Sequence, residues 1–90
     1  MARKESRKLE RVFKGVSNHW RIDILFLIKR SPEISLFEIA DRLKANRKTI
    51  AEHSRKLMIA GLINKRYKGK LRMHTLSPYG EKVVKILANF

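Results

Sequence analysis

The sequence contains no cysteine. Disulfides, thiolate metal sites and thiol-based redox sensing are therefore excluded, and the composition is compatible with the cytosol. Long apolar runs are also missing: the longest, residues 24–28, has five residues, whereas a membrane-spanning helix needs about 20. The basic N-terminus is not followed by the apolar region of a secretory signal. We therefore expect a cytoplasmic protein with no membrane partner.

Acidic residues are scarce. The chain has 8 Asp and Glu residues against 22 Lys and Arg residues, and its formal net charge is +14 over 90 residues. Repulsion at this charge opposes compaction, so the excess indicates an anionic partner. The cations concentrate in two neighbouring segments: residues 46–61 hold four cations and one acid, and residues 62–72 hold five cations and no acid. These two segments are the first candidates for contact with a polyanion.

The length and composition suit one small folded domain over residues 1–90. Apolar residues make up 43% of the chain and charged residues 33%, which is typical of folded domains rather than disordered chains. A chain of this size buries only roughly 60–65% of the surface that it exposes when unfolded. We therefore expect a thin core, which a second subunit would help to stabilise.

The spacing of apolar residues predicts two helices in the N-terminal third. Leu9, Val12, Phe13 and Val16 follow the i, i+3, i+4, i+7 rule and indicate a first helix over residues 6–16. The Ser-Asn pair at positions 17–18 offers a cap for a second helix, which runs to about residue 30. This second helix is apolar around most of its circumference, so we expect it to be buried between neighbours on two sides.

A pair of helices joined by a short turn follows. Ser35 and Glu38 form an S-x-x-E capping box that starts a third helix. The turn at residues 44–46 has the length typical of a helix-turn-helix motif. It leads to a fourth helix over residues 46–60, with Asn46 as the cap and Gly61 as the left-handed stop. The expected inward positions of the fourth helix are Ile50, Ser54, Leu57 and Met58.

The last third predicts a hairpin and one more helix. Alternating residues over positions 63–75, interrupted by Gly69, indicate a two-stranded hairpin. The Ser77-Pro78 pair suits the start of a last helix over residues 78–90. The expected fold is mainly α with a small β-hairpin, in the order of four helices, a β-wing and a C-terminal helix. This is the order of a winged helix-turn-helix domain.

Four sequence blocks in this order resemble the ArsR/MarR-type winged helix-turn-helix transcriptional regulators, most closely the ArsR-like branch. Residues 21–25 resemble the family's R-x-x-I-L, residues 35–40 its s-x-x-E-L-A, and residues 49–63 its t-V-S-x-H-L-x-x-L-x-x-A-G-L-V recognition helix; residues 75–80 are closer to the MarR-style L-T-x-x-G. Ala51 and Ser54 depart from the family's usual Ser and Leu. The resemblance implies DNA binding and dimerisation, but not thiolate metal sensing, because cysteine is absent.

The fourth helix would lie in the major groove of duplex DNA, where its N-terminal turn reaches base edges first. Arg47 can form two hydrogen bonds with guanine, and Asn46 could read adenine if its side chain were not already used as the cap. Arg55 and Lys56 suit phosphate contacts. The alternative is a helix with a merely solvated charged face. The candidate DNA-contacting residues of this helix are Asn46, Arg47, Lys48, Thr49, Glu52, His53, Arg55 and Lys56.

The hairpin is the second candidate contact, on the DNA backbone beside the groove. Its density of cations is expected to need phosphates opposite it, each of which would add ~0.9 log units to the salt dependence of binding. Protection of an edge strand by lysine is an alternative for one or two of these cations. The candidate wing residues are Lys65, Arg66, Lys68, Lys70 and Arg72.

Residue patterns for other chemistry are weak. His19, His53 and His74 lack the spacing of metal ligands. Ser54 and His53 face different sides of a helix, and no acid is placed to orient the histidine as a triad requires. We therefore expect no enzyme activity, no cofactor and no metal site.

The two terminal helices carry apolar stripes that suggest dimerisation. In a homodimer, two recognition helices would lie about 34 Å apart on successive major grooves and bind a pseudo-palindrome. The alternative is that the two terminal helices pack on each other within one chain. The candidate interface residues are Leu9, Val12, Phe13, Val16, Val83, Ile86, Leu87 and Phe90.

The resulting hypothesis is a homodimeric, nucleoid-associated transcriptional regulator that binds double-stranded DNA sequence-specifically. The net charge of +14 also suits a sequence-neutral chromatin or RNA-binding module. A winged-helix module that holds another protein through its terminal helices is a third hypothesis. A small-molecule effector, whose identity the sequence does not indicate, would have to bind at the subunit interface.

Overall fold

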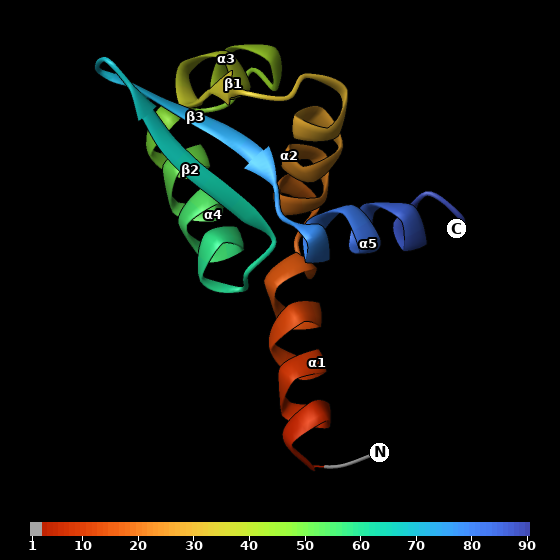
Figure 1. Ribbon diagram of the computed structural model, residues 1–90. Coiled ribbons are helices and arrows are strands. Elements are labelled where there is room, and N and C mark those ends of the chain that lie inside the picture. Colours follow the sequence, from red (N-terminus) through yellow and green to blue (C-terminus); the bar gives the residue numbers. More distant parts are fainter. Residues whose placement is uncertain (1–2) are drawn as a thin grey trace.

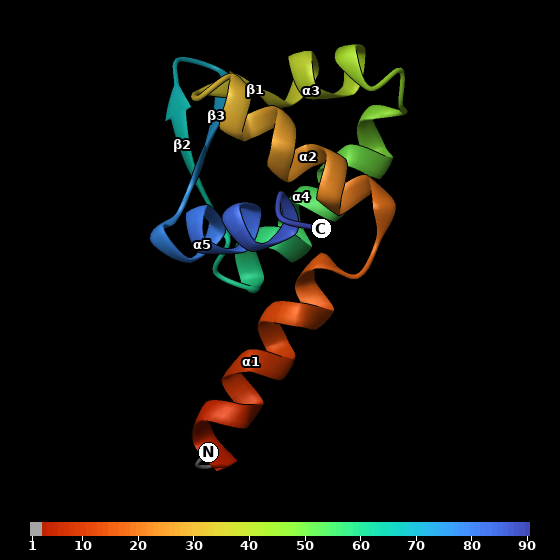
Figure 2. The same ribbon diagram turned by 90° about the vertical axis from the view of Figure 1, so that its right-hand side faces the viewer.

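The computed structural model describes residues 3–90. Its elements follow the predicted order, with one added strand. They are α1 (Arg3–Val16), α2 (His19–Arg30), β1 (Ile34–Ser35), α3 (Leu36–Arg42), α4 (Arg47–Ile59), β2 (Ile63–Lys68), β3 (Leu71–Leu76) and α5 (Pro78–Leu87) (Figure 1). Helix α1 projects away from the body formed by the other elements, as a second view confirms (Figure 2). Over residues 3–90, no helix combines the length and the apolar character needed to cross a bilayer.

The sheet has three antiparallel strands in the order β1-β3-β2, not the two that the sequence predicted. Strands β2 and β3 form the predicted hairpin, with Lys65 opposite His74, and Gly69 takes a positive φ of 63° at its tip. Strand β1 pairs with the other edge of β3, where Ile34 lies opposite His74. The middle of β3, at Met73 and His74, is therefore paired on both sides, whereas the tip of the hairpin extends beyond β1.

The core is built around α2. This helix buries Ile24, Leu25, Leu27 and Ile28 and packs against α1, α4, β3 and α5, in line with the prediction of a helix buried between neighbours. Asn18, rather than its neighbour Ser17, caps α2, because its Oδ1 accepts a hydrogen bond from the Trp20 amide at 2.9 Å.

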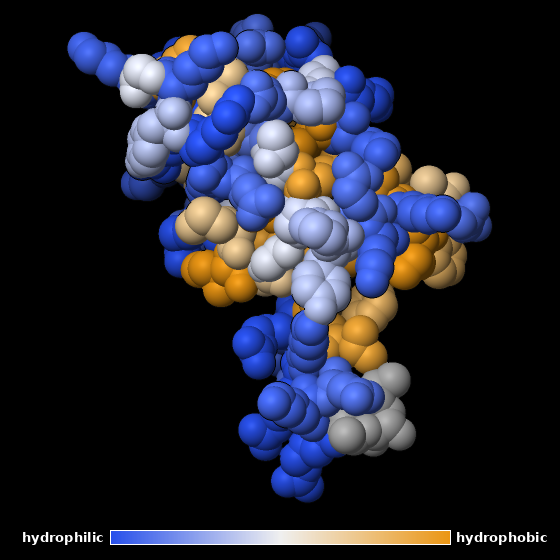
Figure 3. Space-filling view, in the orientation of Figure 1, coloured by the Kyte–Doolittle hydropathy of each residue, from blue (hydrophilic) through white to orange (hydrophobic). Residues whose placement is uncertain are grey.

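The terminal helices differ in extent from the prediction. Helix α1 begins at Arg3, three residues before the expected start, and α5 ends at Leu87, so that Phe90 lies beyond it and is fully exposed. Figure 3 shows apolar side chains on the side of α1 that faces α5 and hydrophilic side chains on its other side. Of the apolar stripe of α1, Leu9 and Phe13 are left exposed, whereas Val16 is buried and Val12 is half-buried.

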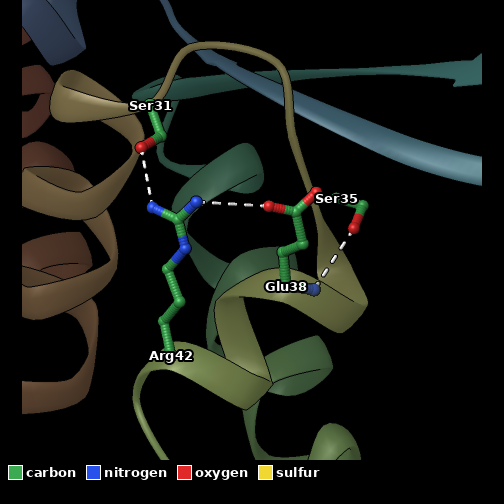
Figure 4. Close-up of polar contacts among 4 residues, drawn as sticks. All are labelled: Ser31, Ser35, Glu38 and Arg42. Atoms are coloured by element: carbon green, nitrogen blue, oxygen red, sulfur yellow. Dashed lines mark hydrogen bonds and ion pairs between the residues drawn. The ribbon is translucent and has the colours of Figure 1, made fainter.

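Helix α3 is fixed by a network that includes half of the expected capping box. Ser35 Oγ accepts a hydrogen bond from the Glu38 amide at 3.2 Å. The Glu38 carboxylate, which would return to the Ser35 amide in a full box, instead pairs with the Arg42 guanidinium at 3.4 Å. Arg42 also donates to Ser31 Oγ at 2.9 Å (Figure 4). The network ties the end of α2 to both ends of α3.

Helix α4 follows a tight turn and packs as predicted with one exception. Lys44 takes a positive φ of 52° in the turn, and Gly61 takes one of 79° after the helix. Ile50, Ser54 and Leu57 are fully buried. Met58, predicted to point inward, is 42% exposed, because it lies to one side of the buried stripe and lines an open groove between α4 and the hairpin instead.

Candidate nucleic-acid interface

The N-terminal end of α4 is exposed and lacks acids. Asn46 Oδ1 accepts a hydrogen bond from the Lys48 amide at 2.7 Å, so this side chain is used as the cap and is not free to read adenine. The first turn of α4 contains no acidic residue, and Arg47 and Lys48 stand there instead. Cations are unfavourable at the positive end of a helix dipole unless an anion is present. This end of α4 is therefore suited to an anionic ligand.

A groove of about 600 Å³ lies between α4 and the wing. We call it the α4–wing groove, and its lining residues are Lys48, Ala51, Glu52, Arg55, Met58, Lys65, Tyr67 and Arg72. It brings together five of the residues that the sequence proposed for DNA contact on two separate elements. Met58 and Tyr67 were not among those candidates, although the strand alternation does place Tyr67 on the same face as Lys65.

The wing divides its cations between two faces. Lys65 and Arg72 line the α4–wing groove. Arg66 and Lys68 alternate with Lys65 along β2, so they lie on the opposite face of the hairpin. On that face Arg66 pairs with Glu33. The density of cations in the sequence suggested a single cationic side. The structure instead divides the wing cations between the two faces of the hairpin.

Charges in the α4–wing groove are only partly compensated. Arg55 and Glu52 form an ion pair at 2.7 Å, and the hydrogen bond from Arg55 lowers the pKa of the Glu52 carboxyl. Burial, followed by repulsion from Arg72 and Arg55, lowers the pKa of Lys65. Glu52 is the single acid lining this groove in residues 3–90, against four cations. An anion in the groove would relieve this repulsion.

The predicted contact residues on the other flank of α4 are less exposed. His53 is half-buried, and burial, followed by repulsion from Arg21 of α2, lowers its pKa. Thr49 is also half-buried, and with His53 it lines a shallow hollow beside Lys48 and Glu52. Lys56 remains exposed. The exposed candidates that follow Arg47 on α4 are therefore Lys48, Glu52, Arg55 and Lys56.

Arg47 is held by an aromatic ring. Its guanidinium carbon lies 4.3 Å from the centroid of the Phe37 ring, which belongs to α3. Phe37 is 47% exposed, and Arg47 is exposed as well. The two helices of the helix-turn-helix therefore meet at the surface through this pair.

A second groove, of about 380 Å³, separates α1 from α5. Leu9, Phe13 and Ile86 line it and are 40%, 56% and 50% exposed. Of the other predicted interface residues, Val16 is buried in the core of this chain, whereas Val83, although buried, still lines the groove. Val12 and Leu87 are half-buried. The two terminal helices border one groove without closing it.

One of the three histidines is enclosed within the domain. His74 is fully buried, and its Nδ1 lies 3.0 Å from the Ile34 carbonyl oxygen, to which it donates as the Nδ1–H tautomer. In residues 3–90, no cluster of three or more His, Asp or Glu residues could hold a metal ion.

Residues 18–68 match the MarR family. No curated protein matches the sequence significantly. Among solved structures, HlyU from Vibrio cholerae N16961 is 26% identical with a TM-score of 0.88, over 98% of this chain and 96% of that one. The transcriptional regulator HlyU from Vibrio vulnificus CMCP6 is 24% identical with a TM-score of 0.80, over 96% and 90% of the two chains.

A domain from Mycobacterium bovis, described as a homodimeric winged helix-turn-helix DNA-binding domain of a possible ArsR-family transcriptional regulator, has the same fold. It is 21% identical with a TM-score of 0.82, over 99% of this chain and 88% of that one. The fold is therefore the winged helix-turn-helix, as the sequence predicted.

Proposed function

Because this chain belongs to the MarR family, we propose that it is a homodimeric transcriptional regulator that binds double-stranded DNA sequence-specifically. Helix α4 with its cap, residues 46–60, enters the major groove, and the wing, residues 63–75, lies on the adjacent backbone. The regulator acts in the cytoplasm, at the nucleoid, and is not an enzyme.

The α4–wing groove is the observation that carries this proposal. Its walls come from both DNA-binding elements of a winged helix, and its four cations face one acid. A cationic groove next to an acid-free helix N-terminus fits the phosphate backbone beside a base-reading helix. Arg47 and Lys48 stand at that N-terminus, where base edges are reached first.

The wing contributes phosphate contacts from its edge and tip. Lys68 and Lys70 are exposed there. They have no ion-pair partner in residues 3–90, so they are free to neutralise phosphates. Arg66 is paired with Glu33, so part of its charge is already neutralised when it contacts a phosphate. Lys65 and Arg72 face the phosphates from inside the α4–wing groove.

A second copy of the chain covers the groove between α1 and α5. Exposed apolar side chains that gather in one groove, as Leu9, Phe13 and Ile86 do here, are typical of an interaction surface. The M. bovis domain with this fold is described as homodimeric, which supports the same assembly here. Two copies place two α4 helices on successive major grooves and select a pseudo-palindromic site.

Selection of bound duplexes from a random pool, followed by competition at roughly 150 mM salt, tests the function. We expect one pseudo-palindromic sequence to be enriched, and its duplex to outcompete random duplex and structured RNA. Equal competition by all duplexes would indicate a sequence-neutral chromatin protein, and stronger competition by RNA an RNA-binding module. Absence of any salt-sensitive binding would indicate a protein-interaction module.

A further inference from the structure

Arg47 and Arg72 differ from the other arginines of the DNA-facing half, because each lies over an aromatic ring: Arg72 over Tyr67 at 5.7 Å, and Arg47 more closely over Phe37. Three of these arginines pair with carboxylates: Arg42 with Glu38, Arg55 with Glu52 and Arg66 with Glu33. Arg47 has no such partner within residues 3–90, and the Phe37 ring takes that place at 4.3 Å. The two kinds of partner use different parts of the guanidinium.

A carboxylate binds the N–H edge of a guanidinium, whereas an aromatic ring binds its face. An arginine paired with a carboxylate has therefore committed some of its donors. Arg47 stacked on Phe37 is restrained in position while its five N–H donors stay free to bind a ligand. Such restraint lowers the side-chain entropy that is lost on binding.

The placement of Phe37 supports a role beyond packing. Phe37 is the second residue of α3, which is anchored by the Ser35 cap and by buried Ile39 and Ala40. Its own side chain is 47% exposed, so the core does not require an aromatic residue here. Arg47 is the first residue of α4. The ring thus comes from a rigid neighbouring helix and reaches the part of α4 where bases are met first.

We infer that Phe37 is a positioning residue, which holds Arg47 for a two-hydrogen-bond contact with a guanine. Guanine presents two acceptors, O6 and N7, in the major groove, and the edge of a guanidinium matches them. The inference rests on the proposed function, because it needs α4 to lie in that groove. It adds a residue outside α4 that determines sequence preference without touching the base.

The test compares binding to the selected duplex with binding to duplexes in which each guanine is replaced in turn. Arg47→Ala identifies the guanine that Arg47 reads. Cation–π contacts at exposed sites are worth about 0.5–1 kcal/mol, so Phe37→Ala should lower discrimination at that guanine by about 2- to 5-fold. Phe37→Leu, which keeps an apolar side chain without a ring, should behave like Phe37→Ala. Phe37→Trp should retain the wild-type value.

The double variant separates positioning from other effects. In an Arg47→Ala background, Phe37→Ala should have no further effect on discrimination. A further loss in that background would overturn the inference, because Phe37 would then act independently of Arg47. If Arg47→Ala lost the same affinity on every duplex and lowered the salt slope, the inference would also be overturned, because Arg47 would then bind phosphate.

The free protein gives a readout that does not depend on DNA. A ring under the guanidinium should shift the NMR signals of the Arg47 δ protons upfield, and Phe37→Leu should abolish that shift with little change in the unfolding midpoint. If the Arg47 δ protons of the wild-type protein showed no upfield shift, the inference about Phe37 would be overturned, and the proposed function would not be affected. A wild-type protein that selects no DNA sequence would overturn the proposed function and, with it, the base contact, even if the shift were present.

Discussion

His74 is a buried histidine whose charge is opposed by its surroundings. It lies between Ile34 and Lys65 in the sheet. Burial is the main cause that lowers its pKa, and the positive charges of Lys65 and Arg72 act in the same direction, against the hydrogen bond to Ile34. Because the folded protein resists protonation at His74, the unfolded chain takes up this proton at a higher pH.

This difference predicts a pH dependence of stability. The free energy of unfolding should be constant for this group above its ordinary pKa of 6.5 and should fall as the pH drops below that value, because the unfolded state then binds more protons. His74→Gln should reduce the slope between pH 7 and pH 5 in urea unfolding. Burial also lowers the pKa of His53, so His53 contributes to the same slope. His53→Gln should therefore remove only the His53 contribution and leave that of His74 intact. An unchanged slope in His74→Gln would refute the prediction.

At the level of elements, Ser77 follows β3 and connects the segment after α4 with the start of α5. Its Oγ accepts a hydrogen bond from the Gly80 amide at 3.0 Å and donates one to the Gly61 carbonyl at 2.6 Å. We expect Ser77→Ala to lower the free energy of unfolding by about 2 kcal/mol, because a cap and a second hydrogen bond are lost together. Ser35→Ala, which removes a cap alone, should lower it by about 1 kcal/mol. Urea unfolding checks both values, and equal losses would contradict the bridging role.

Helix α4 and the wing should contribute differently to DNA binding. Arg47→Ala should flatten sequence preference, because a base contact is lost. Lys68→Ala combined with Lys70→Ala should weaken binding to all duplexes alike and lower the salt slope by about 2, since two phosphates are no longer neutralised. Titrations at several salt concentrations on the selected duplex and a random duplex measure both quantities. If both variants changed preference and slope to the same degree, this division between the elements would be wrong.

The sequence allowed the helices to be predicted because each carries its own signal. Asn18, Asn46 and Ser77 are caps that act on residues two or three positions away. Strand β1 carries no such signal: two residues are too few to alternate, and Ile34 joins the sheet only because β3 lies beside it. The Phe37–Arg47 contact depends on the angle between two helices, which local patterns do not determine.

The sequence predicted which residues form the candidate site better than it predicted how their side chains are arranged. Alternation along β2 separates Lys65 from Arg66 and Lys68, but only the register of the hairpin, which places Arg72 opposite Tyr67, brings Arg72 to the face of Lys65. Met58 was assigned inward because its position borders the buried stripe, and the width of that stripe depends on how α4 packs against the sheet.

At the level of the whole molecule, the groove between α1 and α5 predicts the oligomeric state. Phe13 is 56% exposed in it, and Phe13→Glu would place a charge in the interface between two copies. We expect this variant to sediment as a monomer and to bind the pseudo-palindromic duplex on the order of 100-fold more weakly, because two linked half-sites bind more tightly than one. Lys4→Glu, exposed on the same helix but outside the groove, should remain dimeric. A monomeric wild-type protein would contradict the prediction.

The double hydrogen bond of Ser77 has a consequence for the distance between half-sites. A single oxygen atom connects the segment that ends α4 with the first turn of α5, and α5 borders the surface where two copies would meet. A molecule that tilts α5 must therefore break at least one of these two hydrogen bonds or rotate α4 with it. In a dimer, such a rotation would change the separation of the two α4 helices, so that occupancy at the subunit contact and fit to the operator would be mechanically linked.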